Sequence, residues 1–326
     1  MRSGPFLFAA LIALAIGGPA TLPAAAQSYP SRPIKVIVPF PAGGPIDSIG
    51  RLIGQHMTAE LGQSIVLENR PGAGGTLGAN IVANAPPDGH TLLMGSTTTL
   101  SISPHLYKNI GYDPEKGLVP VATVSTGAMV LVVSPKVPVS SVKELIAYAK
   151  AHPGTLNYGA GTASPPHLAG ALFKEMTGTN VVFVPYRGAA PAIIDLLAGQ
   201  IQFEIDAIGT LKPHVDSGKL KALAVTGEAR DPAMPNVPTM IEAGVAGYNL
   251  DFWTGVAVAA GTPPDVITKL NTAINKALGS ADVQAAMTKF SIAPKISTPQ
   301  QATNFMEHES KKWGAIVKQA GVQLAN

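Results

Sequence analysis

Short apolar runs alternate with amphipathic segments in the first part of the chain. Ile34–Pro39, Ser64–Leu67 and Thr91–Gly95 are rich in branched aliphatic residues. Runs of this length suit parallel strands that are buried on both faces. Ser48–Leu61 and Thr76–Ala85 lie between them and have the periodicity of amphipathic helices. This alternation is typical of βαβ units, which build a mostly parallel sheet flanked by helices.

A second alternation of the same kind follows a long apolar segment. Pro120–Thr126 and Met129–Ser134 predict one long strand that is broken near Gly127. Proline favours the first turn of a helix, which supports helices that begin at two later prolines. The elements expected here are helices over Val142–Ala151, His167–Thr177, Ala189–Leu197, Pro264–Leu278 and Pro299–Ala320, and strands over Leu156–Tyr158, Val181–Pro185, Gln202–Asp206, Ala222–Thr226 and Leu250–Ala257.

The two alternations predict an α/β protein with two lobes. No low-complexity linker separates them, so the chain is expected to cross between the lobes more than once. The crossings are expected near Gly127 and in the strand around Asp251–Gly255. Lobe 1 would then comprise residues 27–126 and 253–326, and lobe 2 residues 127–252.

The N-terminal 26 residues have the pattern of a secretory signal peptide. A positive start at Arg2 precedes an apolar run over Pro5–Ile16, and Ala24–Ala26 supplies small residues for cleavage. The apolar run is too short to span a membrane. We therefore expect an exported protein without stable membrane insertion, and the periplasm of a Gram-negative bacterium fits best.

Composition excludes several classes of function. Hydrophobic residues make up 46% of the 326 residues and charged residues 13%, as in a well-buried globular protein. The net charge of +3 and the absence of a Lys/Arg run argue against nucleic-acid binding. The chain has no cysteine, and its 7 histidines are scattered outside any metal-binding motif. No metal and no cofactor are expected.

The clearest candidate for ligand chemistry is the glycine turn after the first strand. Gly43 and Gly44 allow close backbone approach, and the amides that open the following helix favour an anion. A tight connection with a helix cap is the alternative interpretation. Asp47 is interpreted as a cap or a packing residue, because its carboxylate would repel an anionic ligand.

Polar residues at other strand ends are further candidates. Thr162 and Ser164 precede two prolines and mark a helix start, where capping and carboxylate binding are compatible. Asp206 ends a strand. It is either a turn or hinge acid or a residue that hydrogen-bonds to an amine or hydroxyl of a ligand or to a water. Ser96 and Thr97, with Thr98 next to them, either form a polar turn or line the rim of lobe 1.

Other motifs give weaker indications of a ligand-binding or catalytic site. Arg187, next to Tyr186, is either a solvated or structural group or a bidentate partner of a carboxylate. The glycines of Gly72–Gly78 do not match the spacing of a nucleotide-binding motif, and no G-x-S-x-G nucleophile elbow occurs. The spacing of Ser164 and His167 suits packing at a helix start better than a catalytic pair.

Several motifs, in order along the mature chain, resemble one family. They are Tyr29–Ile34 leading into Pro39–Gly44, Leu67–Gly75, Pro87–Leu93, Val184–Gly188 with Asp195–Gln200, and Val237–Thr239 with Glu242–Gly244. These segments resemble the Bug family of periplasmic solute-binding proteins, the receptors of tripartite tricarboxylate transporters.

The resemblance implies a two-lobed Venus-flytrap fold of the type II periplasmic-binding-protein class. It also implies a small carboxylate held in the cleft by two loops, here Phe40–Gly44 and Gly159–Pro166. The second loop departs from the family pattern, because Ala160, Thr162 and Ala163 stand where serine and further glycines are more usual. The expected ligand-binding residues are Phe40, Ala42, Gly43, Gly44, Ser96, Thr97, Thr162, Ala163, Ser164 and Asp206, with Tyr186 and Arg187 as further candidates.

The expected function is capture of a carboxylate and its delivery to the membrane subunits of a tripartite tricarboxylate-type transporter. We expect a monomer that is not an enzyme. Two alternatives remain open at this point: an exported hydrolase on a two-lobed α/β fold, and a ligand-loaded partner of a sensor kinase.

The signal-peptide pattern gives the first prediction. Export should cleave the chain after Ala26 and leave Gln27 at the new N-terminus, because the small residues of Ala24–Ala26 suit the cleavage site. Intact-mass measurement of the protein from the periplasm checks this. A mass that still includes residues 1–26 would contradict it.

Overall fold

The computed structural model describes residues 29–322, in which strands of both halves join one continuous sheet. The proposed signal peptide lies outside the described residues. Along the sheet the strand order is β2 (Ile65–Asn69), β1 (Ile34–Val38), β3 (Thr91–Ser96), β9 (Asp251–Ala259), β4 (Leu118–Val133), β7 (Phe203–Ala207), β5 (Asn157–Gly161) and β6 (Val182–Tyr186). Two shorter pairings add β8 (Lys221–Val225) and β10 (Ala293–Pro294) to β4.

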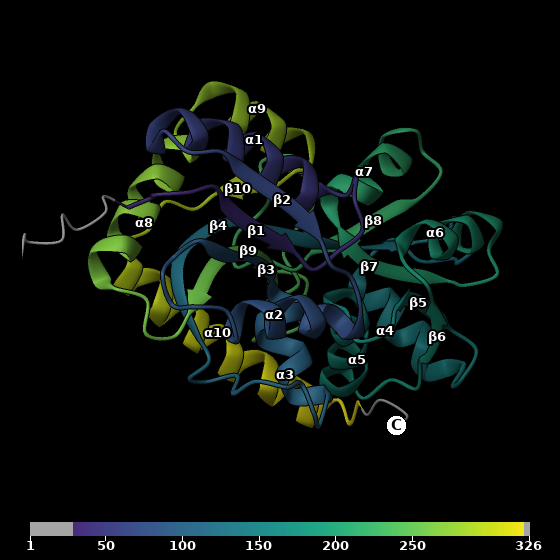
Figure 1. The fold of residues 1–326 in the computed structure, drawn as a ribbon. Helices are drawn as coiled ribbons and strands as arrows, with labels where there is room; N and C mark the ends of the chain where they lie inside the picture. Colours follow the sequence, from purple (N-terminus) through teal and green to yellow (C-terminus); the bar gives the residue numbers. More distant parts are fainter. Residues whose placement is uncertain (1–28, 323–326) are drawn as a thin grey trace, which may run out of the picture.

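The sheet has parallel ends and an antiparallel centre. Strands β1, β2 and β3 are parallel to one another, and β5 is parallel to β6 and β7. In the centre β9 runs antiparallel to both β3 and β4, and β4 runs antiparallel to β7. The two parallel ends lie in the two halves of the molecule (Figure 1). The α/β, two-lobed architecture expected from the sequence is therefore confirmed.

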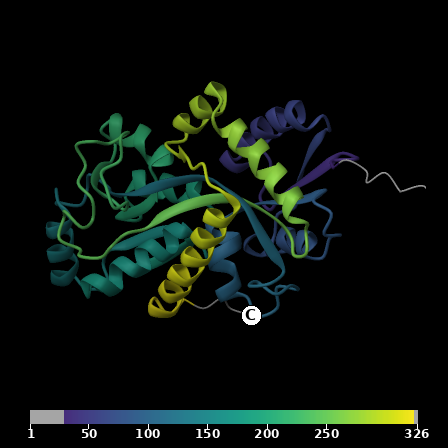
Figure 2. The ribbon, with the colours of Figure 1, turned by 90° about the vertical axis from the view of Figure 1, so that its left-hand side faces the viewer.

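Helices cover both halves. The half that contains β1–β3 carries α1 (Pro45–Leu61), α2 (Thr76–Ala83), α8 (Pro264–Leu278) and α9 (Ala281–Lys289), and the half that contains β5–β7 carries α4 (Val142–Ala151), α5 (Pro165–Thr177), α6 (Ala189–Ala198) and α7 (Ile208–Asp216). Short helices η1 (Ala73–Gly75), η2 (Thr98–Ile102) and α3 (Ser103–Leu106) complete the first half. The last helix, α10 (Pro299–Gln319), lies across the junction of the halves (Figure 2).

Strand β4 contributes to the cores of both halves. Its early residues, Val121 and Val124 among them, pack with α1 and α8 in the first core. Its late residues alternate between the two faces of the sheet: Met129 and Leu131 pack on the α5 side, and Val130 and Val132 on the α6 side. This alternation follows from the two-residue period of a strand.

The expected break of β4 near Gly127 was wrong. Gly127 is a regular member of β4 and pairs with Phe252 of β9. A side chain at Gly127 would meet the Phe252 ring at 2.6 Å. The glycine therefore lets an aromatic ring approach the strand and does not interrupt it.

The sequence patterns missed several short elements. Helix α7 contains Gly209, Thr210 and Pro213, which all lower helix propensity, but its Ile208 and Leu211 are fully buried. Helix α9 and the turn of helix that follows β3 were missed as well. Within residues 29–322, no helix is both long and apolar enough to cross a membrane.

Candidate functional site

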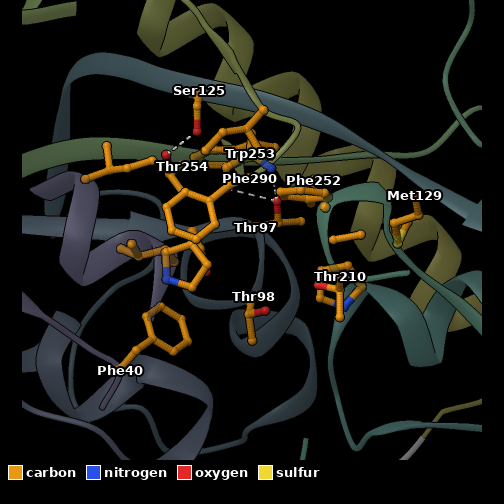
Figure 3. Close-up of a pocket in the computed structure, with 18 of the residues that line it drawn as sticks. Phe40, Thr97, Thr98, Ser125, Met129, Thr210, Phe252, Trp253, Thr254 and Phe290 are labelled. Carbon is orange, nitrogen blue, oxygen red and sulfur yellow. Dashed lines mark hydrogen bonds between the residues drawn. The ribbon is translucent and has the colours of Figure 1, made fainter. Parts of the chain in front are cut away.

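A cavity of about 460 Å³ lies where the two halves meet. Figure 3 shows Phe40 and Phe290 on one side of it and Met129 and Thr210 on the other. The lining residues are Phe40, Pro45, Ile46, Ile49, Met94, Ser96, Thr97, Thr98, Ser125, Met129, Pro165, Pro166, Asp206, Ala207, Gly209, Thr210, Phe252, Trp253, Thr254, Phe290 and Ile292. Both halves and the central strands therefore contribute to one site.

Three hydroxyl residues form a row across the central strands. Ser96 of β3 pairs with Thr254 of β9, which pairs with Ser125 of β4, so the three side chains share one face. The hydroxyls of Ser125 and Thr254 are 2.7 Å apart. Ser96 is only 7% exposed, and its hydroxyl has no hydrogen-bond partner among the described residues. These three residues all line the cavity, so its polar positions are concentrated in this row.

Most of the remaining wall is apolar. Phe40, Ile46 and Ile49 form it on the side of α1, and Phe252 and Phe290 contribute two further rings. Such a wall stabilises an apolar ligand body by excluding water from it. The cavity is thus built for a molecule with an apolar part and few polar groups.

Helix starts supply positive potential to the cavity. Pro45 and Ile46 begin α1, and Gly209 and Thr210 lie in the first turn of α7. The first amides of a helix lack internal partners and carry partial positive charge. Among the residues that line the cavity, none is lysine, arginine or histidine. An anion at this site would therefore be held by main-chain and hydroxyl donors.

The glycine turn before α1 differs from the expected free cradle. The Gly43 amide donates to the Asp47 carboxylate over 3.0 Å, and Arg51 and Asn69 donate to the same carboxylate over 2.9 and 3.0 Å. The Arg51 guanidinium holds the pKa of Asp47 below its usual range. Asp47 is buried and packed, as one of its two interpretations expected, while α1 has no side-chain cap hydrogen bond. The Gly43 amide is not free to bind a ligand.

The start of α5 is also satisfied by its own side chains. Ser164 accepts from the His167 amide, and the Ala163 amide donates to Nδ1 of His167 over 3.2 Å. Pro165 and Pro166 have no amide hydrogen to offer. The expected cap at Ser164 is therefore confirmed, and the Ala163 amide is not free to bind a carboxylate.

His167 is placed for structure. Burial lowers its pKa to about 4, so the ring is neutral and accepts at Nδ1. The ring stacks on Phe183 with 3.8 Å between the ring centroids. The Ser164 hydroxyl donates to the Gly161 carbonyl over 2.5 Å. No serine–histidine catalytic pair forms here.

The structure brings only some of the candidate residues together. Phe40, Ser96, Thr97 and Asp206 line the cavity. The candidates that do not line it are Ala42, Gly43, Gly44, Thr162, Ala163, Ser164, Tyr186 and Arg187, although neighbours of the two predicted loops, Pro45–Ile46 and Pro165–Pro166, do.

Two of these outlying candidates have other surroundings. The Tyr186 hydroxyl donates to Asp195 over 2.6 Å, and Arg187 is exposed. The sequence patterns missed Ser125, Thr254 and Phe252 as lining residues. The one indication in the sequence was that Ser125 and Thr254 are hydroxyl residues within the largely apolar strands β4 and β9.

An acid pair lies on the other side of the cavity. Glu204 and Asp206 are two residues apart on β7, so both side chains point to the same face of the sheet. Glu204 is fully buried, and among the described residues its neighbour Asp206 is the one hydrogen-bond partner in reach of its carboxyl group. Asp206 is 8% exposed and accepts from the Ala207 amide over 2.6 Å.

The pair is not fully ionised. Burial and the neighbouring Asp206 raise the pKa of Glu204 to about 9, and burial raises the pKa of Asp206 to about 6. Glu204 is therefore a neutral carboxylic acid at neutral pH. Asp206, at the cavity wall, is more easily protonated than an exposed aspartate.

The comparisons with known proteins agree on one family. A family model described as the tripartite tricarboxylate transporter family receptor matches residues 49–322. Protein BugT of Bordetella pertussis is 38% identical over 304 residues, which is 93% of each chain. The solved structure of R. palustris Rpa4515 with adipate is 36% identical, with a TM-score of 0.80 over 90% of this chain and 99% of that one. The structure of the periplasmic binding protein BugD is 35% identical, with a TM-score of 0.76 and the same coverage.

The buried Glu204 gives a pH-dependent prediction. Folding raises its pKa from the ordinary value of 4.5 to about 9, so the folded state holds a proton that the unfolded chain releases. This contribution to stability is complete below pH 4.5 and is lost as the pH rises toward 9. Glutamine has no proton to release, so Glu204→Gln does not lose stability in this way. The unfolding free energy of the variant minus that of wild type should therefore be about 1–3 kcal/mol higher at pH 8 than at pH 5.

Urea unfolding of both proteins at the two pH values measures this difference. Glu228→Gln, at an exposed glutamate, is the matched control and should show no such change. An equal effect of Glu204→Gln at pH 5 and pH 8 would contradict a neutral, buried Glu204.

Proposed function

The chain belongs to the tripartite tricarboxylate transporter receptor family, and from this premise we propose that its cavity captures a small carboxylate. It is a solute-binding receptor and not an enzyme. The resemblance drawn from the sequence motifs is thereby confirmed. Proteins of this family are periplasmic binding proteins.

The observation that carries the proposal is the combination of helix starts and apolar walls around one cavity. The start of α1 contributes Pro45 and Ile46, and the start of α7 contributes Gly209 and Thr210. The amides of Ile46, Gly209 and Thr210 and the row of hydroxyls are donors for a carboxylate, whereas Pro45 has no amide hydrogen. The phenylalanine side chains would pack on its hydrocarbon part.

Four of the residues singled out in the sequence keep a role in this proposal. Phe40 would pack against the ligand, and Ser96, Thr97 and Asp206 contribute polar side chains to the same cavity. A solved relative of similar size holds adipate, a carboxylate with an aliphatic body. That ligand chemistry matches the division of this cavity into polar and apolar parts.

Closure of the two lobes is part of the proposal. The lobes would divide as residues 27–126 with 253–326, and residues 127–252. The cavity draws residues from both parts, so a ligand that contacts both stabilises the closed state. Strands β4 and β9 would act as the hinge because they run between the parts.

The partners and the location follow from the family. We expect export with removal of residues 1–26 and delivery of the ligand to transporter subunits in the membrane. A monomer suffices for this role. Neither the hydrolase nor the sensor-kinase alternative gains support from a specific contact in the described residues.

A panel of four acids tests the proposal. Mature protein is heated with adipate, malate, hexanoate or benzoate, and with hexanamide and benzamide as uncharged controls. At a hundredfold excess over the dissociation constant, a bound acid stabilises the protein by about 2.7 kcal/mol. At least one acid should raise the melting temperature, and the amides should not. An equal rise with an acid and its amide, or no rise with any acid, would contradict carboxylate capture.

Two side-chain truncations locate the site. Phe40→Ala removes part of the apolar wall and should weaken binding of the acid by about 1–3 kcal/mol. Arg187→Ala is the matched control: Arg187 is exposed and does not line the cavity, so its loss should cost less than about 2 kcal/mol.

Titration calorimetry on both folded variants gives the affinities. A loss of about 3–5 kcal/mol for Arg187→Ala would instead indicate a buried bidentate pair with the ligand. Unchanged affinity in Phe40→Ala would place the ligand elsewhere.

A further inference from the structure

Asp206 is the one ionisable side chain among the residues that line the cavity. Its Oδ1 accepts from the Ala207 amide, and Glu204 lies next to it on the same face of β7. A carboxylate ligand would therefore enter a cavity whose only charged side chain has the same sign as its own. In a buried site two neighbouring carboxylates do not both remain ionised.

Within residues 29–322, the surroundings of the acid pair supply no cation. Val130 and Val132 of β4 lie opposite Asp206 and Glu204, and this face is covered by apolar residues of α6 and α7. The titratable groups on this side are Tyr186 of β6, which donates to Asp195 of α6, and the side chains of α7.

The charged groups of the other packed elements are engaged elsewhere. Lys212 of α7 pairs with Asp216 over 2.6 Å, and Lys221 of β8 donates to the Val139 carbonyl over 2.9 Å. On the opposite face of β7, His167 of α5 is buried and neutral, and the Tyr158 hydroxyl of β5 donates to the His167 carbonyl. His214, in the last turn of α7, lies at the end of that helix away from the cavity.

We infer that the Glu204–Asp206 pair takes up one proton when a carboxylate binds, and that Asp206 then donates a hydrogen bond to the ligand. The inference rests on the proposed function and assigns Asp206 as a specificity-determining residue. The proton comes from the solvent and forms an O–H bond on Oδ2, while Oδ1 keeps its bond to the Ala207 amide. A ligand that carries an ammonium group would instead pair with the ionised Asp206 and would take up no proton.

Burial lowers the cost of this uptake. It has already raised the pKa of Asp206 above its ordinary value, so protonation at neutral pH needs less free energy than at an exposed aspartate. Glu204, neutral beside it, adds no second negative charge. A bound carboxylate raises the pKa of Asp206 further by like-charge repulsion.

Calorimetry of adipate binding between pH 6.5 and pH 8.5 tests the inference, with the other three acids of the panel measured in the same way. Above about pH 6 ordinary carboxylic acids are fully ionised, so a change in affinity reports on the protein. Wild-type affinity should fall by up to about tenfold per pH unit. Titrations at one pH in phosphate and in Tris buffer should give different enthalpies, with an uptake that approaches one proton at pH 8.

Asp206→Asn places a permanently neutral donor at the same position. This variant should bind with no pH dependence and no proton uptake, and at pH 8 it should bind about tenfold or more tightly than wild type. Asp195→Asn, at an acid of the neighbouring helix α6, is the matched control and should keep the wild-type pH dependence. Glu204→Gln should also keep it, because Asp206 still titrates.

The outcomes separate this inference from the proposed function. An acid that binds wild type without proton uptake overturns the inference and leaves carboxylate capture intact. Weaker binding by Asp206→Asn at every pH also overturns it, because Asp206 would then be an ionised acceptor for the ligand. If none of the four acids binds at any pH, carboxylate capture fails and the inference fails with it. If Asp206→Asn does not fold, the measured proton uptake of the wild-type protein is sufficient to support or overturn the inference.

Discussion

The antiparallel ladder between β4 and β9 is the constraint on which the rest of the structure depends. It begins at the pair Leu118 and Ala259, in the first half, and ends at the pair Ala128 and Asp251, where β4 enters the second half. Each half builds its own core on part of β4, so neither core is complete without this strand. A buried main-chain group that lost its ladder partner would cost about 1–3 kcal/mol, so the register is strongly fixed.

The register of this ladder also determines the chemistry of the cavity. Ser96, Thr254 and Ser125 come together only because β3, β9 and β4 pair at these positions. A shift of one residue in the register would move these hydroxyls to the other face of the sheet, into a hydrophobic core. It would also bring their apolar neighbours to the cavity. The Trp253 main chain is held from the side by the Thr97 hydroxyl, which accepts from its amide over 2.7 Å. Fold and site therefore share the same hydrogen bonds.

The hydrophobic pattern of the sequence predicted the strands and longer helices well, because these elements are made by local periodicity. It failed at α7, where buried Ile208 and Leu211 override the low helix propensity of Gly209 and Pro213. It also misjudged Gly127, because the approach of Phe252 depends on a partner strand far away in the sequence. The pairing of Ser125 with Thr254 could not be predicted for the same reason, since 129 residues separate the two. Asp47 is packed as one interpretation expected, but its partner Asn69 could not be predicted, because Asn69 lies on a neighbouring strand 22 residues away.

The donors that a sequence pattern places near a cavity are not all free to bind a ligand. At α1 the Gly43 amide is used by Asp47, and at α5 the Ala163 amide is used by His167. The chain thus neutralises part of its own helix-start potential before any ligand arrives. What remains toward the cavity is the row of hydroxyls, the first turns of α1 and α7, and the single acid Asp206. With so few polar groups, each one carries a large share of the discrimination, and the protonation of Asp206 alone changes the sign of its interaction with a carboxylate from repulsion to a hydrogen bond.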